Sequence, residues 1–398
     1  MMLARFLSKI YKKKGIVLID SMGQKYICGK PDLKKPLTLT LLKKDLNWKL
    51  LINPDLNFPE AYMRGEIKID NGSLLDFLNL TFENIGREEI NVYGYMFKKL
   101  LHIWRFATNY NLPKKSKKNV ERHYDIGEDL YDLFLDKKHR QYSCAYFLNE
   151  NDSLEDAQQN KINHIIKKLD LRPGQKVLDI GCGWGGMAFE IARQSQCEVT
   201  GVSLSENQIN YCKKKAKELK MDNQVNFELR DYREVKEKFQ KIVSVGAFEH
   251  FGRKFYKTFF KKVKDIMTDD GICLLHTIGS VDAPGPVQPF IQKRIFPGGI
   301  VPSLSEVVGP IEKSGLIIAD CETLIHHYDK TLKHWLDRFL NNREKAKNLF
   351  DKEFVRMWEC YLSMCSAAFH FRDLVVYQLQ LVKNFTAIPS NNRKYIYQ

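Results

Sequence analysis

The sequence predicts an α/β protein in which a doubly wound, mostly parallel sheet is joined to a smaller N-terminal domain. Two observations carry this prediction. After about residue 123, short β-branched runs alternate with amphipathic helical segments, and a glycine-rich turn connects the first run to the helix behind it. Such alternation is typical of parallel βαβ units of Rossmann-like type, and 398 residues are enough for two domains.

The front of the chain, residues 1–111, predicts a small domain of mixed structure. A helix is expected first, because four apolar side chains recur with helical spacing: Leu3, Phe6, Leu7 and Ile10. Four short β-like runs are expected to follow: GIVLID (15–20), PLTLTLL (36–42), WKLLINPD (48–55) and GEIKID (65–70). Residues 73–110 are expected to be helical, and the lysine-rich residues 112–121 predict a linker to a catalytic domain over residues 122–398.

The second part of the chain supplies the strands of the predicted parallel sheet. Five runs are expected to be strands: QKVLDI (175–180), CEVTGVSL (197–204), QVNFELRD (224–231), KIVSVGA (241–247) and GICLLHTIG (271–279). Three helical segments lie between them: GMAFEIARQ (186–194), NQINYCKKKAKELK (207–220) and KFYKTFFKKVKDIM (254–267). A long, mostly apolar segment over residues 354–383 also looks helical. Ligands of such sheets bind at the carboxyl ends of the strands, where the strand order reverses.

Composition and charge limit the classes of partner and the kinds of site that the chain could have. Residues 1–122 contain 23 basic and 12 acidic residues, a balance of +11, whereas the rest of the chain carries only +4 of the total of +15. A basic front module indicates a polyanionic partner, either nucleic acid or an anionic membrane surface. Nine scattered cysteines without a CxxC pair, and ten histidines without HExxH, favour a reducing cytoplasm and no metal site. No apolar run is long enough for a membrane-spanning helix, and no signal peptide is evident.

The glycine-rich turn indicates the cofactor. Asp179 precedes a loop that contains Gly181, Gly183 and Gly185 and continues into a helix. A nicotinamide dinucleotide would call for an acidic residue at the end of the second strand, and Ser203 stands there instead. The string VLDIGCGWGG (177–186) resembles the first motif of class I S-adenosylmethionine methyltransferases.

Four further residues are predicted to hold the adenosine part of S-adenosylmethionine. Ser203 and Gln208 stand where this class often places an acid for the ribose hydroxyls. The third strand ends in Asp231 and Tyr232, whose carboxylate could accept a hydrogen bond from the adenine amino group and whose ring could pack on the base.

Further motifs follow in order along about residues 122–385. They are RHYDIGEDLYDLFLD (122–136), QYSCAYF (141–147), VLDIGCGWGG (177–186), GVSLSENQ (201–208), SVGAFEHFG (244–252), LLHTIG (274–279), FIQKRIFPGG (290–299), HYDKTLKHW (327–335) and CSAAFHFRD (365–373). Together they resemble the cyclopropane-fatty-acyl-phospholipid synthases, a mycolic acid cyclopropane synthase-like family. The resemblance implies methyl transfer to the cis double bond of an unsaturated acyl chain in a membrane phospholipid, followed by ring closure.

The resemblance also implies the catalytic residues. The base in this family is a bound bicarbonate, whose cage maps onto Cys144 and Ile278 through backbone groups, and onto the side chains of Glu249, His276 and Tyr328. Tyr142 and Ser143 are expected to close over the methionine end of the cofactor, with the HYDIG stretch upstream as a lid. Cys365 matches a cysteine often named in the family's active site, and we expect it to line the acyl pocket without reacting.

Alternatives remain open at this point. A related lipid methyltransferase could give a methyl-branched product, because only the fate of the carbocation differs. A nucleic-acid methyltransferase is disfavoured, since GAFEHFG (246–252) stands in place of an Asp/Asn-Pro-Pro-aromatic motif. A non-catalytic lipid-binding protein would have little need of the glycine loop.

The mode of membrane attachment is also open. We expect a peripheral membrane protein, either as a monomer or as a homodimer. Its first helix could lie in the membrane interface or dock on the N-terminal domain. The loop with Lys293 and Arg294 suits an acyl entrance beside a phosphate headgroup and a plain surface loop about equally.

Overall fold

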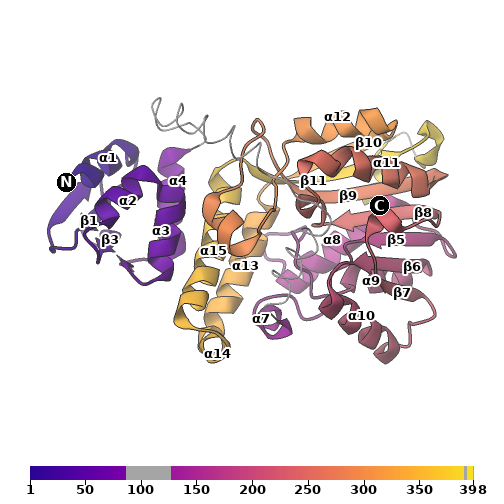
Figure 1. The fold of residues 1–398 in the computed structure, drawn as a ribbon, viewed down its shortest axis with the longest axis horizontal. Helices are drawn as coiled ribbons and strands as arrows, with labels where there is room; N and C mark the ends of the chain where they lie inside the picture. The colour runs from indigo at the N-terminus through magenta and orange to yellow at the C-terminus, as the bar shows by residue number, and fades with distance from the viewer. Residues whose placement is uncertain (87–126, 390–391, 398) are drawn as a thin grey trace. The chain divides into compact units, whose positions relative to one another are not determined.

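The computed structural model describes residues 1–86, 127–389 and 392–397 (Figure 1). Contacts group the chain into two compact units. The first contains Met1–Ala107, Val287–Pro297 and Leu332–Leu374, and the second contains Thr108–Pro286, Gly298–Thr331 and Val375–Gln398. The predicted linker and the HYDIG stretch before Gly127 lie outside the described residues, so the boundaries of the predicted domains stay a prediction.

A seven-stranded sheet forms the centre of the second unit. Its strands are β5 (Lys176–Ile180), β6 (Glu198–Ser203), β7 (Val225–Leu229), β8 (Phe239–Val245), β9 (Met267–Ser280), β10 (Ile317–Leu324) and β11 (Leu374–Val382). The order is β10-β11-β9-β8-β5-β6-β7; β5 is parallel to both β6 and β8, whereas β10 and β11 pair antiparallel. The predicted doubly wound, mostly parallel sheet is therefore confirmed, and its order reverses between β5 and β8.

Helices cover both faces of this sheet (Figure 1). One face carries α8 (Leu154–Leu169), α9 (Gly186–Ser195) and α10 (Glu206–Glu218), and the other carries α11 (Tyr256–Ile266) and α12 (Leu304–Ser314). Alternate residues of one strand serve the two cores, since Val177 packs with α8 and α9 whereas Leu178 packs with α11. Short elements complete the unit: α7 (Glu128–Asp132), η1 (Tyr232–Glu234), η2 (Phe248–His250), η3 (Arg253–Phe255), η5 (Phe385–Ala387) and α16 (Lys394–Tyr397).

The first unit contains a small four-stranded sheet and helices from two parts of the chain. Its strands, β1 (Ile16–Ile19), β2 (Lys25–Cys28), β3 (Thr38–Leu41) and β4 (Ile67–Asp70), follow the order β2-β1-β3-β4. Its helices are α1 (Met2–Ile10), α2 (Leu46–Ile52), α3 (Pro54–Met63), α4 (Leu74–Ile85), the π-helical η4 (Ile291–Ile295), α14 (Arg343–Leu349) and α15 (Lys352–Phe371). Helix α13 (His327–Asn341) begins in the second unit and continues in the first. Within the first unit, α3 and α4 pack against α15.

Two expected elements are wrong. Residues 48–55 form the end of α2 and the start of α3 rather than a strand, because Leu46 and Leu50 are buried one helical turn apart. A short apolar run does not distinguish the two periods by itself. The apolar segment 354–383 is helical only as far as Phe371; its second half is β11, whose β-branched start and paired neighbours β9 and β10 favour a strand.

Helix α1 docks on the first unit. Leu3 and Ile10 are buried, and the helix contacts α2 and β2. Half of the apolar stripe is thus occupied by the protein itself, which supports the docked alternative and contradicts insertion of the whole stripe into a membrane. No helix among the described residues is long and apolar enough to cross a membrane.

Candidate active site

The glycine loop after β5 lies at the point where the strand order reverses. Gly181, Gly183 and Gly185 have φ values of +79°, +53° and +80°, in the left-handed region that glycine adopts without strain. The loop is tightly held, because a Cβ on Gly181 would lie 2.4 Å from the side chain of Ala247. A Cβ on Gly183 would meet no atom within 4 Å, so this glycine leaves open space above the loop.

A cavity opens at this loop. It lies entirely within the second unit, and nine of the sequence-predicted residues line it: Tyr142, Ser143, Asp179, Gly181, Gly183, Ser203, Gln208, Asp231 and Tyr232. Gly185 lies behind the loop, where a Cβ would lie 2.9 Å from Cys212 Sγ.

Asp179 is the buried acid of this cavity. Asp179 is the next-to-last residue of β5, directly before the glycine loop, and it is 2% exposed. Its Oδ2 has no hydrogen-bond partner among the described residues. Burial raises the pKa of Asp179 to about 7, and the nearby positive charge of Lys161 opposes that rise. A buried carboxylate oxygen without a partner is the kind of acceptor that a ligand hydroxyl or ammonium group would satisfy.

The residues predicted for the adenosine part lie at or just beyond the carboxyl ends of β6 and β7, the strands that follow β5 in the sheet. Ser203 Oγ donates to Gln208 Oε1 at 3.1 Å, which fixes both side chains at the end of β6. Burial acts to raise the pKa of Asp231, but hydrogen bonds from Arg233, including one of 2.8 Å from Nε, outweigh it and lower the pKa. Asp231 is thus held as a carboxylate at the wall of the cavity, beside the buried ring of Tyr232.

A second polar cluster lies at the carboxyl ends of β8 and β9. Glu249 Oε1 accepts a hydrogen bond of 2.6 Å from the backbone N–H of Ile278, while Glu249 Oε2 has no partner among the described side chains and backbone groups. Burial raises the pKa of Glu249 to about 7. The Ile278 N–H was expected to bind bicarbonate, but in this structure it donates its hydrogen bond to Glu249.

His276 lies on β9, two residues before Ile278. Its strand pairs with β8 so that His276 lies opposite Val245, four residues before Glu249. The ring is buried, and its Nδ1 lies 3.2 Å from Nε2 of Gln378 on β11. Burial lowers the pKa of His276, so the imidazole is neutral at pH 7. A Gln378 amide that donates to Nδ1 leaves the ring proton on Nε2.

The segment with Cys144 is hydrogen-bonded to the start of α13, the helix that contains Tyr328. Ala145 N donates to Thr331 Oγ1 at 3.0 Å, and Phe147 N donates to His327 Nδ1 at 3.1 Å. Both Cys144 and Tyr328 are buried. Burial raises the pKa of the Cys144 thiol far above neutral, which is consistent with a role through its backbone.

Comparisons with known proteins identify the family. Residues 112–379 match the family described as Mycolic acid cyclopropane synthetase. The cyclopropane-fatty-acyl-phospholipid synthase of Escherichia coli (strain K12) is 37% identical over 347 residues, which cover 86% of this chain and 87% of that protein. The chain belongs to this family. The resemblance in the sequence is thereby confirmed, and the chain is an S-adenosylmethionine-dependent methyltransferase.

Solved structures of the mycolic acid cyclopropane synthetase family agree with this assignment. The cyclopropane synthase MmaA2 from Mycobacterium tuberculosis matches with a TM-score of 0.64 and 33% identity, covering 67% of this chain and 97% of that one. The mycolic acid cyclopropane synthase CmaA1, described as complexed with SAH and CTAB, matches with a TM-score of 0.63, 33% identity and the same coverage.

Cys365, Lys293 and Arg294 belong to the first unit. Burial raises the pKa of the Cys365 thiol, on α15, to about 12, so the thiol is protonated at neutral pH. Lys293 Nζ and an Nη atom of Arg294 lie 2.7 and 3.1 Å from Glu60 Oε1. This carboxylate competes with any phosphate for the two cations.

Sequence reasoning missed several groups at the cavity. Arg140 lines it and places its guanidinium over the rings of Trp184 and Tyr211, at 4.4 and 4.9 Å from their centroids. The ring of Tyr142 lies edge-on to that of Tyr131, 5.2 Å away. These contacts join residues that are distant in the sequence, so no local sequence pattern predicts them.

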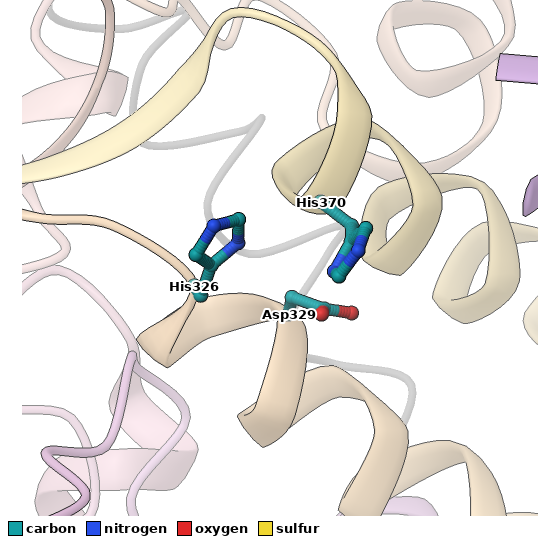
Figure 2. A group of neighbouring side chains, drawn as sticks. All are labelled: His326, Asp329 and His370. Atoms are coloured by element: carbon teal, nitrogen blue, oxygen red, sulfur yellow. The ribbon is translucent and has the colours of Figure 1, made fainter. Parts of the chain in front are cut away.

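A group of two histidines and one aspartate is divided between the two units. Figure 2 shows His326, directly before α13, and Asp329, in the first turn of α13, both in the second unit, and His370 from the last turn of α15, in the first. Protein zinc sites use at least three protein ligands. Neither unit by itself supplies three from this group of described residues.

Proposed function

We propose that this enzyme methylates the cis double bond of unsaturated acyl chains in membrane phospholipids and closes a cyclopropane ring, with a bound bicarbonate as the base. Family membership supports cyclopropane synthesis on lipid chains, and the Escherichia coli relative is named for a phospholipid product. The observation that carries the proposal is the buried side chain of Glu249, which is held by the backbone N–H of Ile278 and keeps one carboxylate oxygen unsatisfied.

The cavity fits S-adenosylmethionine, which supplies the methyl group when bound. Gly183 leaves the space for close approach, and Asp179 Oδ2 offers a buried acceptor for a polar group of the ligand. Ser203 and Gln208 would hold the ribose, and Asp231 and Tyr232 the adenine. Tyr142 and Ser143 would enclose the methionine end.

The Glu249 cluster fits an anion with a hydroxyl group. Glu249 Oε2, as a carboxylate, would accept the hydroxyl of bicarbonate and turn its charged oxygens away. His276 would donate from Nε2 to one of those oxygens, and Tyr328 from its hydroxyl. In this arrangement the chain's own residues orient the base and exclude water; none of them has to act as a nucleophile.

The basic front module would bring the enzyme to an anionic membrane surface. Leu3 and Ile10 of α1 are buried, whereas α2 exposes Trp48 and Ile52 one helical turn apart, 58% and 75% exposed. The adjacent exposed lysines are Lys43, Lys44 and Lys49. An aromatic ring between lysines suits the interface of an anionic bilayer.

Lipid analysis tests the proposal. Phospholipids from cells that express the chain should contain unsaturated acyl chains heavier by one CH₂ group, and cells that express Glu249→Gln should lack them. Mild hydrogenation then separates the products, because a cyclopropane resists it and a methyl-branched alkene takes up hydrogen. A product that hydrogenates would establish the methyl-branching alternative. With purified enzyme, removal of bicarbonate should slow turnover and its return should restore it.

A further inference from the structure

Lys161 is a lysine whose side chain is completely buried beside the cofactor cavity. It lies in the middle of α8 and is 0% exposed. Its Nζ donates to Gln141 Oε1 at 2.5 Å and to Ser143 Oγ at 2.8 Å. Both acceptors line the cavity, whereas Lys161 does not. A buried ammonium group is costly unless partners and opposite charges compensate it.

The compensating charges lie on two sides of Lys161. Asp136 and Asp179 both favour its charged form, although burial lowers the pKa of Lys161 to about 8. Asp136 in turn accepts hydrogen bonds from the backbone N–H groups of His139 and Gln141, each at 2.7 Å. The lysine, the aspartate and the turn over residues 136–143 therefore form one connected network.

The same helix adds a further contact to this turn. Gln158, one turn before Lys161 on α8, donates from Nε2 to the backbone carbonyl of Ser143 at 2.9 Å. Two fully buried polar side chains of α8 thus hold the side chain and the backbone of a single serine. Such an arrangement exceeds what is needed to pack a helix, because apolar side chains would fill the same space without desolvating an ammonium group.

We propose that Lys161 is a positioning residue for the methyltransferase reaction: through Gln141 and Ser143 it holds the wall of the cavity that encloses the methionine end of S-adenosylmethionine. The inference rests on the assignment of this cavity to the cofactor. Its consequence is that loss of Lys161 weakens cofactor binding without removing any group that touches the reacting double bond.

Lys168 provides a matched control. It lies two helical turns further along α8, is 1% exposed, and pairs with Glu322 away from the cavity. Lys168→Met removes a buried ammonium from the same helix, so it reproduces the general structural cost. Lys161→Met and Lys161→Gln are the test variants; the glutamine keeps a polar group if the methionine variant does not fold.

The experiment measures S-adenosylhomocysteine binding by calorimetry, and KM for S-adenosylmethionine and kcat at saturating lipid. We expect Lys161→Met and Lys161→Gln to bind S-adenosylhomocysteine about ten- to a hundredfold more weakly and to raise KM more than they lower kcat. Lys168→Met should bind it as the wild type does. Unchanged affinity and KM in both Lys161 variants, or an equal loss in Lys168→Met, would overturn the inference.

Gly183→Val separates this inference from the assignment on which it rests. If Gly183→Val abolishes S-adenosylhomocysteine binding and the Lys161 variants bind normally, the cavity is the cofactor site and Lys161 has no positioning role. If Gly183→Val also binds normally, the cavity itself has been misassigned.

Discussion

Glu60 in the first unit and two acids at the candidate site of the second unit bury charge in different ways. In the first unit, Glu60 is paired with Lys293 and Arg294, and these cations outweigh burial and lower its pKa. In the second unit, Asp179 and Glu249 each keep one oxygen without a partner among the described residues, and burial raises the pKa of each to about 7. Paired charges stabilise a fold by themselves, whereas buried unpaired carboxylates mark places where a ligand completes the structure.

The sharpest test of this contrast is the unpaired oxygen of Glu249. Glu249→Gln keeps the shape but replaces an acceptor with an amide, so we expect turnover to fall by about 30- to 1000-fold, the usual cost of one oriented contact. S-adenosylhomocysteine affinity should stay within a few-fold of the wild type. His276→Ala and Tyr328→Phe should change the same two quantities in the same direction.

The matched control for Glu249 is the paired carboxylate. Glu60→Gln removes an ion pair at a partly exposed site in the first unit, where we expect a change in stability of less than about 1 kcal/mol. Wild-type turnover in Glu249→Gln, measured with and without bicarbonate, would contradict the cage.

The second prediction concerns the cofactor loop. Gly183→Val adds a β-branched side chain at φ +53° that points into open space of the cavity, so we expect S-adenosylhomocysteine affinity to fall by more than about a hundredfold. Gly174→Val is the control, because Gly174 has a φ of +78° and open space around its Cβ, but lies outside the cavity. Calorimetry on both variants separates backbone strain from obstruction; equal affinities would place the cofactor elsewhere.

The third prediction is a pH dependence. Below pH 7 Glu249 is protonated and cannot accept the bicarbonate hydroxyl. At a fixed concentration of bicarbonate ion, kcat/KM for lipid should therefore rise about tenfold per pH unit below pH 7 and level off above it. His276 is neutral throughout this range because burial lowers its pKa.

Variants assign this pH dependence to one residue. Asp179 has a pKa near the same value, so saturating cofactor is required, and Asp179→Asn should keep the rise whereas Glu249→Gln should lose it. A rise that survives in Glu249→Gln would assign the titration to another group.

The second unit could be predicted from the sequence more completely than the first. All five expected strands and the glycine loop are present, because alternating β and α runs report a parallel sheet locally. The two antiparallel strands were not predicted: β10 was not expected, and β11 was expected to be helical. In the first unit residues 48–55 were misread, since a short apolar run fits either period. The partners of buried polar groups could not be predicted from the sequence, because they are distant along the chain. Lys161 and Ser143 are 18 positions apart, and His276 and Gln378 are 102 positions apart.

The fourth prediction concerns the membrane surface of the first unit. Trp48→Ala removes an exposed ring from α2, and we expect about tenfold weaker binding to vesicles of anionic phospholipid. Phe385→Ala removes a ring that is 84% exposed in the second unit and should bind as the wild type does. Co-sedimentation should also weaken with salt. An equal loss in both variants, or none in Trp48→Ala, would exclude α2 as the contact.

The smallest effect is expected at Cys365. Burial raises the pKa of its thiol to about 12, and apolar neighbours on α15 offer no base to ionise it. A thiol that stays protonated is a poor nucleophile, and the proposed reaction needs none. Cys365→Ser changes one atom of a half-buried side chain, so turnover should stay within about threefold of the wild type, with any loss reflecting packing. Thermal unfolding of the same variant shows whether it folds normally. Complete loss of turnover in a normally folded Cys365→Ser protein would mean that the Cys365 thiol takes part in the reaction. The reacting groups would then come from both units and not from the second unit alone.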